Sequence, residues 1–307
     1  MNVAVDAGHG YTKGLSVGGQ RILFPSLIAP LPPFVDLADF GHSDIITIDD
    51  APYLVGDAAR THATPLWSRD KAADTDTLRL ILVAAAKLGS VGPIQLATGL
   101  PLSWFGSQRR SFRKALTGFG SVVQLPNHAP QRLWFESVRV LPQGVAAAAP
   151  VLSGADFEAG DYLVVDIGYR TTDYIVVTKA EDGSLDYEPS AAGSLEIGMH
   201  TVTQTIAQAI TDQYQVSYSA SEVESRPFVV VRGQKIDVTQ RFHEARQVTA
   251  KRLAQELAAA LGPQVDKLMG IVAVGGGSDI LAAAIPGIIV PEEPQWANVV
   301  GYLMALG

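Results

Sequence analysis

The sequence predicts an α/β protein made of two related domains that flank a ligand cleft. Two stretches indicate the repeat: DAGHGYTK, from Asp6 to Lys13, and DIGYRTTD, from Asp166 to Asp173, share an Asp-x-Gly start and lie 160 positions apart. Each follows an apolar run, NVAV in the first case and YLVV in the second. Apolar β-rich runs alternate with helical patterns along most of the chain, which is typical of α/β domains.

The first predicted domain covers residues 1–150. NVAVDA, GLSV and RILF have the pattern of a β-meander, and residues 25–70, rich in Pro, Asp and small residues, that of a loop-heavy insertion with a short strand at IITI. We then expect a helix at 75–88, a strand at IQLATG, a helix carrying QRRSFRKAL, strands near 121–125 and 131–141, and a helix in PQGVAAAA.

The second predicted domain, residues 151–290, restarts the same order with three strands in DYLVVDIGYRTTDYIVVTKAEDGSLDYEPSA. A long helix follows, with an apolar face formed by Met199, Val202, Ile206, Ile210 and Tyr214. FVVVRGQKI indicates a hairpin, and a second long helix ends at Gly262-Pro263, with its apolar side formed by Phe242, Ala245, Val248, Leu253, Leu257 and Leu261. Strands GIVAV and GIIV come next, and a C-terminal helix within 291–307 is expected to join the first domain.

Composition excludes several classes of protein. The chain has 307 residues, no cysteine and a formal charge of −8, which argues against a disulfide framework, a thiolate metal site and direct binding of nucleic acid. The basic stretch RRSFRK at 109–114 is interpreted as a solvated helix face. The longest apolar run, LRLILVAAAKLG, is broken by charges, and the N-terminus has no secretory pattern. We expect a soluble cytoplasmic protein that contacts no membrane.

The two Asp-x-Gly turns have the residues of a phosphate site. An Asp at a strand end, followed by Gly, sets a carboxylate beside backbone N–H groups, and Gly8 and Gly10 permit close approach of a ligand. Consecutive N–H groups in such a turn bind anions, and a carboxylate beside a phosphate indicates Mg²⁺ held through water. The candidate side-chain donors to phosphate are Lys13, Thr12, Thr171 and Thr172. The alternative is two ordinary hairpin turns, in which Asp and Gly are common; the matching spacing favours the ligand.

Other phosphate and catalytic motifs do not fit. The chain has no G-x-x-x-x-G-K-[ST], no H-E-x-x-H and no G-x-S-x-G, and GHGYTKG has one residue too many for a dinucleotide fingerprint. A third glycine cluster, Gly275–Gly277, follows the strand GIVAV and precedes Ser278-Asp279. Backbone without side chains there could lie against an adenine or a ribose.

Five motifs together resemble the ATP site of the actin/Hsp70/sugar-kinase superfamily. VAVDAGHGYTK looks like its phosphate-1 loop, LVVDIGYRTTD like phosphate-2, LPQGVAAA at 141–148 like connect-1, VAVGGGSDI like the adenosine motif and PQWANVVGY at 294–302 like connect-2. They occur in order over nearly the whole chain. RILFPSLIAP, PQGV and DIGYRTTD are most similar to ParM/StbA-type bacterial and archaeal actin-like proteins, although many ParM proteins have Glu where this chain has Gln143.

The resemblance implies two actin-like, ribonuclease H-like domains around a nucleotide cleft, and it implies roles for residues. Asp6 and Asp166 would hold hydrated Mg²⁺, and Gln143 would orient the attacking water. Asp173 would either take part in catalysis or fix its turn. The positions implied to contact ATP or GTP are Gly8, His9, Gly10, Tyr11, Thr12, Lys13, Gly168, Tyr169, Arg170, Thr171, Thr172, Asp173, Gly275, Gly276, Gly277 and Ser278.

The function implied by the resemblance is that of a Mg-dependent ATPase whose nucleotide controls assembly into a homopolymeric filament. For a ParM-like protein the cargo is plasmid DNA, reached through a DNA-binding adaptor protein, and the acidic charge fits such indirect contact. One alternative is a sugar or acetate kinase of the same superfamily, which usually needs a longer chain and a catalytic base outside the phosphate loops. A second alternative is a scaffold that binds nucleotide without polymerising.

Overall fold

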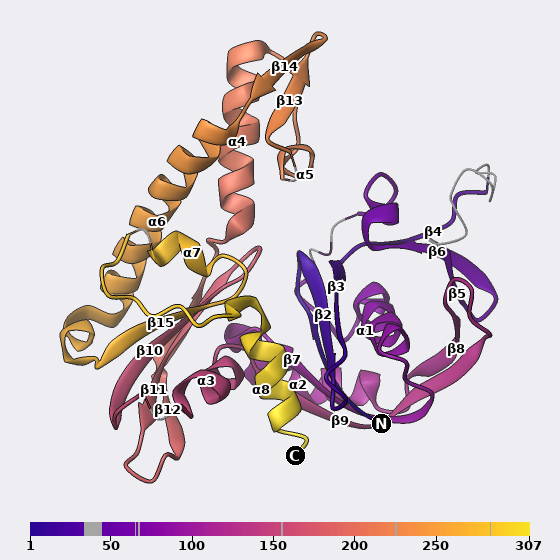
Figure 1. Ribbon diagram of the computed structural model, residues 1–307, viewed down its shortest axis with the longest axis horizontal. Coiled ribbons are helices and arrows are strands. Elements are labelled where there is room, and N and C mark those ends of the chain that lie inside the picture. The colour runs from indigo at the N-terminus through magenta and orange to yellow at the C-terminus, as the bar shows by residue number, and fades with distance from the viewer. Residues whose placement is uncertain (34–44, 65, 67, 155, 225, 283) are drawn as a thin grey trace. The chain divides into compact units, whose positions relative to one another are not determined.

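The computed structural model describes residues 1–33, 45–64, 66, 68–154, 156–224, 226–282 and 284–307 (Figure 1). The chain forms two compact units. Unit 1 comprises Met1–Val151 and Trp296–Gly307, and unit 2 comprises Leu152–Gln295. The chain therefore leaves unit 1 once and returns to it for its last segment.

Nine strands form one mixed sheet among the described residues of unit 1: β1 (Asn2–Ala7), β2 (Tyr11–Ser16), β3 (Arg21–Pro25), β4 (Ile28–Pro30), β5 (Ile45–Ile48), β6 (Ala51–Val55), β7 (Gly92–Leu100), β8 (Gly120–Gln124) and β9 (Gln131–Pro142). Their order is β3-β2-β1-β7-β9-β8-β5-β6-β4. β1, β2 and β3 form an antiparallel meander, whereas β1, β7 and β9 run parallel. Almost every residue of β1 is buried, as expected of a strand covered on both faces.

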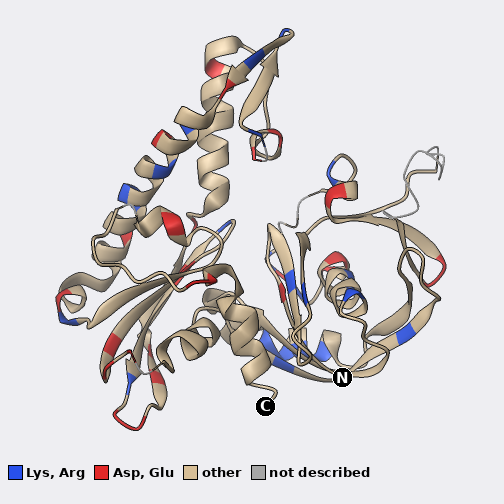
Figure 2. Ribbon diagram, in the orientation of Figure 1, with Lys and Arg blue, Asp and Glu red and all other residues tan. Residues whose placement is uncertain are grey.

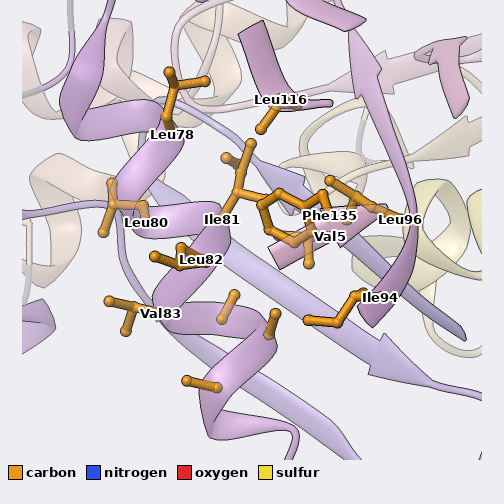
Figure 3. Close-up of a cluster of buried hydrophobic side chains, with 14 of the residues drawn as sticks. Val5, Leu78, Leu80, Ile81, Leu82, Val83, Ile94, Leu96, Leu116 and Phe135 are labelled. Carbon is orange, nitrogen blue, oxygen red and sulfur yellow. The ribbon is translucent and has the colours of Figure 1, made fainter. Parts of the chain in front are cut away.

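Two helices, α1 (Thr75–Lys87) and α2 (Leu102–Leu116), contribute to the main core of unit 1. α1 begins where the carboxylate of Asp74 accepts the backbone N–H of Asp76, a regular N-cap. A 3-10 turn, η1 (Gly56–Ala59), precedes the segment that leads to α1. Figure 3 shows the side chains through which the helices meet the sheet: Val5, Leu78, Leu80, Ile81, Leu82, Val83, Ile94, Leu96, Leu116 and Phe135.

A second, smaller core of unit 1 joins the sheet to α3 (Val145–Leu152), to η3 (Pro294–Trp296) and to the C-terminal helix α8 (Ala297–Met304). Gly301 permits this packing, because a Cβ at that position would overlap the backbone of Ala146. The buried residues of this core are Ala4, Leu15, Ala97, Ala146, Trp296, Val299 and Tyr302.

Unit 2 contains a four-stranded sheet in the order β12-β11-β10-β15, formed by β10 (Gly160–Ile167), β11 (Thr172–Lys179), β12 (Leu185–Leu195) and β15 (Gly270–Val274). The first three strands form an antiparallel meander, and β15 runs parallel to β10. This order matches β3-β2-β1-β7 of unit 1 strand for strand. The predicted repeat of the meander is confirmed.

The helices of unit 2 are α4 (Met199–Tyr214), the short α5 (Ala220–Val223), α6 (Thr239–Leu261), the 3-10 segment η2 (Gly262–Lys267) and α7 (Ser278–Ala282). Figure 1 shows α4 and α6 side by side, with the hairpin of β13 (Phe228–Val231) and β14 (Gln234–Asp237) at one end of the pair. The turn of this hairpin has positive φ at Arg232 and Gly233, as two-residue hairpin turns require. The predicted apolar face of α4 is confirmed at Val202, Ile206 and Ile210.

Some sequence predictions are wrong in detail. The insertion at 25–70 contains β4, β5 and β6 rather than one strand, although 34–44, 65 and 67 lie outside the described residues. GIIV contributes a single bridge, between Ile289 and Val272, and no strand. Val248 is 66% exposed, because the buried face of α6 follows a four-residue repeat through Ala245, Thr249 and Leu253 that bypasses position 248.

Charged residues occur along the helices of both units. Figure 2 shows both signs interspersed along α6, and the basic residues of RRSFRK are exposed on α2, as the sequence predicts for a solvated face. None of the described helices combines the length and the apolarity that crossing a bilayer requires.

Candidate functional site

The first turn, defined here as Asp6–Lys13, joins β1 to β2. Asp6 lies opposite Lys13 in the antiparallel register, and the Lys13 ammonium Nζ is 3.6 Å from Asp6 Oδ2. The N–H of Gly8 donates to the carbonyl of Tyr11 at 3.1 Å and closes the turn. The Asp6 carboxylate is therefore buried beside a cation.

Gln143 supplies a second contact to Asp6. It follows β9 at the carboxyl ends of the parallel strands, its backbone N–H donates to the Leu100 carbonyl, and its side-chain Nε2 donates to Asp6 Oδ1 at 2.9 Å. The sequence interpretation set Gln143 inside a helix, but α3 begins at Val145. The reason is Gly144, whose φ of +78° ends the strand and whose N–H donates to the Asn298 side chain.

Two further side chains of the first turn, His9 and Thr12, contact protein groups. The His9 ring bonds the Leu66 carbonyl at 2.5 Å and packs edge-on against Trp104 of α2. The Thr12 hydroxyl is buried and shares a hydrogen bond of 2.8 Å with that of Ser26. In this structure the Thr12 hydroxyl fixes the turn, and its contact with phosphate stays a prediction.

The second turn, defined here as Asp166–Asp173, joins β10 to β11 with the same geometry. The N–H of Gly168 donates to the Thr171 carbonyl at 2.9 Å, as Gly8 does to Tyr11. The buried Thr172 hydroxyl donates to the Ile197 carbonyl at 2.7 Å and so anchors the turn, and its role as a phosphate donor stays a prediction.

The charge of the second turn differs from that of the first. Asp166 lies opposite Asp173 in the register, so two buried carboxylates occupy the positions that Asp6 and Lys13 occupy in unit 1. Side chains directly opposite on antiparallel strands point to the same face, with Cβ atoms about 5 Å apart. Two carboxylates placed in this way favour a bound cation.

Helix α4 begins directly against the second turn. The backbone N–H groups of Met199 and His200 donate to the carbonyls of Gly168 and Tyr169, at 3.1 and 2.7 Å. A Cβ on Gly198, the N-cap, would collide with the backbone of this turn, which explains the glycine. The turn and the start of α4 therefore form one rigid piece of backbone.

Two side chains at the tip of the second turn contact acidic groups of unit 2. The Tyr169 hydroxyl donates to Glu224 Oε2 at 3.2 Å and lies 3.4 Å from Nδ1 of His200. Arg170 is 3.8 Å from Glu196. Burial, together with the positive charge of Arg170, lowers the pKa of His200 below its ordinary value.

The glycine triplet lies at the end of β15, beside the second turn. Gly275 has a φ of +86°, and a Cβ there would overlap the Asp166 carboxylate; a Cβ on Gly277 would lie 2.6 Å from the Ile167 side chain. Gly276 differs, because a Cβ there would meet nothing within 4 Å. Packing explains two of the three glycines and leaves Gly276 facing open space. Ser278, which begins α7, is buried.

The sequence-predicted residues thus form two groups. Unit 1 brings Asp6, Lys13 and Gln143 together, and unit 2 brings the second turn and Gly275–Gly277 together. Sequence reasoning missed Lys71, which is buried and donates to the Ala7 carbonyl of the first turn. No motif marks a lone lysine in a loop.

No cluster of three or more His, Cys, Asp or Glu suited to a metal occurs among the described residues. The donor set of the second turn, two carboxylates, nevertheless fits a magnesium ion that keeps several waters and takes the rest of its ligands from a phosphate.

Comparison with known families assigns both units. The family "Actin like proteins N terminal domain" matches residues 4–145, and "Archaeal actin homologue MreB-like, C-terminal" matches residues 164–286. The chain belongs to the actin-like proteins. The archaeal actin homologs of Thermoplasma acidophilum and Thermoplasma volcanium are each 26% identical to it, over 98% of this chain and 97% of theirs.

Solved structures of actin-like proteins have the same fold. The crystal structure of an archaeal actin homolog superimposes with a TM-score of 0.85 at 22% identity, over 99% of this chain and 98% of that one. A non-polymerisable quadruple mutant of pCBH ParM gives 0.84 at 22% identity, with the same coverage. A 15-stranded ParM filament from Clostridium botulinum gives 0.85 at 21% identity, again with this coverage. The predicted actin-like α/β fold is confirmed.

Proposed function

We propose that this actin-like protein uses its two matched turns to bind a Mg-nucleoside triphosphate, hydrolyses it, and assembles with copies of itself under control of the bound nucleotide. The observation that carries the proposal is the pair of matched turns. They share the Asp register, the glycine hydrogen bond and the buried threonine anchor, yet one presents a cation and the other a second carboxylate.

The charge difference suits a metal–polyphosphate ligand. Lys13 would bind phosphate oxygens, whereas Asp166 and Asp173 would favour the cation that accompanies them. Asp6 would reach the metal only through water, because Lys13 and Gln143 already engage its carboxylate. A bound magnesium ion would supply charge stabilisation to the transferring phosphoryl group. A crystal structure of an archaeal actin homolog at 24% identity is described as a complex with ADP, which supports a nucleotide ligand.

Gln143 is the residue best suited to act on water. Its Nε2 donates to Asp6, so the orientation of the amide is set and its Oε1 is the atom that would accept a hydrogen bond from the attacking water. Hydrolysis of this kind depends on positioning and charge stabilisation more than on covalent chemistry. The backbone of the two turns and of Gly276 would bind the phosphates and the nucleoside.

Similar proteins of known structure support the assembly part of the proposal. One is a ParM filament, and another is a non-polymerisable ParM mutant. We propose a homopolymeric filament whose cargo is plasmid DNA, reached through a DNA-binding adaptor protein, since the formal charge of −8 disfavours direct contact with DNA.

Right-angle light scattering at micromolar protein tests the assembly. We expect scattering to rise after addition of Mg-ATP or Mg-GTP and to decay as the triphosphate is consumed. A Gln143→Ala variant should hold the signal longer, because hydrolysis is slower. A ligand can shift assembly only through different affinities for the two states, so a diphosphate should give a smaller signal.

The control is Gln95→Ala, which removes an exposed glutamine of the same sheet. A trace that stays flat with every nucleotide, at several salt and protein concentrations, would contradict the filament. If sugars or small carboxylic acids then stimulated turnover, a small-molecule kinase would be the better assignment.

A further inference from the structure

Lys71 is a buried cation beside the first turn. It lies in the segment before α1, its side chain is 4% exposed, and its Nζ donates to the Ala7 carbonyl at 2.6 Å. Lysine is rarely buried to this degree unless its ammonium group is paired with another group or has a functional role. The contact lies between Asp6 and Gly8, at the centre of the proposed phosphate site.

The loop that carries Lys71 is itself fixed. Asp70 accepts the N–H of Ala72 on its Oδ1 at 3.0 Å, which shapes the loop just before α1. Gln108 of α2 holds the other side: its Nε2 donates to the Arg69 carbonyl at 2.6 Å, and its Oε1 accepts the N–H of Lys71 at 3.4 Å. The lysine therefore reaches the turn from a preorganised backbone.

The bond to Ala7 supports the closed form of the first turn. A peptide unit is planar, so a bond to the Ala7 carbonyl also helps to hold the N–H of Gly8, which belongs to the same plane and donates to the Tyr11 carbonyl. The same bond also covers a carbonyl oxygen whose partial negative charge would repel a phosphate. An ammonium group does both tasks and adds a full positive charge.

The second turn covers its corresponding carbonyl with a different group. The carbonyl of Ile167, which follows Asp166 as Ala7 follows Asp6, accepts the backbone N–H of Gly277 at 3.0 Å. Both turns thus satisfy the same carbonyl with a donor from a distant segment. The donor is charged in unit 1 and neutral in unit 2, so a neutral donor is enough to satisfy this carbonyl.

We propose that Lys71 is a positioning residue for the polyphosphate of the nucleotide: it orients the Ala7–Gly8 peptide and gives the first turn a second positive charge besides Lys13. This inference rests on the proposed nucleotide binding. Its effect increases with the number of phosphates and is absent for a nucleoside, since adenosine carries no charge for the ammonium to attract.

Calorimetry with Mg-ATP, Mg-ADP and adenosine tests the proposal on the full chain. For Lys71→Met we expect the Mg-ATP affinity to fall about 10- to 100-fold, the range of a charge-assisted hydrogen bond, the ADP affinity to fall less, and the adenosine affinity to stay unchanged. Lys71→Arg keeps the charge and should restore most of the loss. Lys114→Met, on the exposed face of α2, is the matched control and should bind as the wild type does.

Each outcome decides the matter. A folded Lys71→Met protein with wild-type affinity for all three ligands overturns the role of Lys71 alone. An equal loss for ATP and adenosine, without recovery in Lys71→Arg, shows a merely structural role and also overturns it. If Lys71→Met does not fold, Gln108→Ala decides: a selective loss for ATP supports the proposal, and no change overturns it. Wild-type protein that binds no nucleotide removes the proposed function and this inference together.

Discussion

The first and second turns of this protein share the same backbone geometry but carry different charges. In both, an Asp ends a central strand, a glycine N–H closes the turn and a buried threonine anchors it. Across the hairpin, however, Asp6 faces Lys13 whereas Asp166 faces Asp173. The two turns therefore share their backbone geometry and differ in the charge of the residue that lies opposite the Asp.

Some residues of the turns stabilise the backbone, and others are proposed to contact the ligand. Thr12 and Thr172 are fully buried and bonded within the protein, so a duplicated motif residue need not touch the ligand. The residues that differ between the turns, Lys13 and Asp173, are the informative ones. Four predictions test the roles assigned to the two turns and to the residues beside them.

The largest effect is expected for Asp166→Asn compared with Asp6→Asn. Asp166→Asn removes the carboxylate that we assign to the metal, and turnover should fall on the order of 10³-fold, since a bound metal contributes several kcal/mol to transition-state stabilisation. Triphosphate binding in this variant should lose its dependence on Mg²⁺. Asp6→Asn should keep that dependence. Calorimetry with and without Mg²⁺, and phosphate release, measure both quantities.

Asp161→Asn is the control, at the other end of the same strand, where Asp161 accepts the Thr178 hydroxyl. If Asp6→Asn lost the Mg²⁺ dependence and Asp166→Asn kept it, the charge contrast between the turns would have been assigned the wrong way round.

Gln143→Ala should slow turnover roughly 100-fold and leave triphosphate affinity within about threefold. A group that positions water contributes to the transition state rather than to ground-state binding. The variant also frees Asp6 from its amide partner, so the apparent pH profile of turnover is measured alongside the rate. A phosphate-release rate equal to that of the wild type would show that another group orients the water.

Gly276→Val and Gly275→Ala should behave in opposite ways. A Cβ at Gly276 meets no protein atom within 4 Å, so the valine variant should melt as the wild type does but bind adenosine about tenfold more weakly. Gly275→Ala introduces a side chain at positive φ against Asp166, which should destabilise the fold by roughly 1–3 kcal/mol. Thermal melting and calorimetry measure the two effects. If Gly276→Val bound adenosine with wild-type affinity, the glycine triplet would have no role in binding the nucleoside.

The smallest effect concerns His200. Burial lowers the pKa of His200 in the folded protein, so the unfolded chain takes up its proton first as pH falls. The stabilisation is complete above the ordinary histidine pKa of about 6.5 and declines as pH drops below that value. His200→Asn should therefore flatten the loss of stability between about pH 7.5 and 5.5, by less than about 1 kcal/mol. Denaturant midpoints at both pH values measure it, with the exposed His243→Asn as control. If His200→Asn lost more stability at low pH than the wild type does, the assigned direction of the pKa shift of His200 would be wrong.

The repeat of the fold was predictable from sequence because it depends on local patterns. An apolar run followed by an Asp and a glycine at fixed spacing predicts each turn. Apolar residues three and four positions apart predict the α4 helix. The short strands β4 and β6 were missed because they are defined by their pairing with distant chain rather than by their own pattern. Val248 was misassigned because several apolar residues near it fit more than one helical face.

The site was predictable only in part. The spacing of the two turns selected Asp6 and Asp166, but nothing in the sequence states which hydroxyl will be buried or that Gln143 will bond Asp6. Lys71 shows the limit most clearly, since its position 64 residues beyond Ala7 carries no signal until the chain folds. Interactions made between remote segments need the tertiary structure.

The return of the chain to unit 1 through α8 affects how the protein can be synthesised. Unit 2 is continuous, from Leu152 to Gln295, whereas unit 1 needs Trp296–Gly307 to complete its second core. The ribosome therefore synthesises the whole of unit 2 before it synthesises α8, the helix that packs on the apolar residues Ala4, Leu15 and Ala97. During that interval the nascent first unit is a candidate client for chaperones, and loss of the final turns of chain would damage the domain made first rather than the one made last.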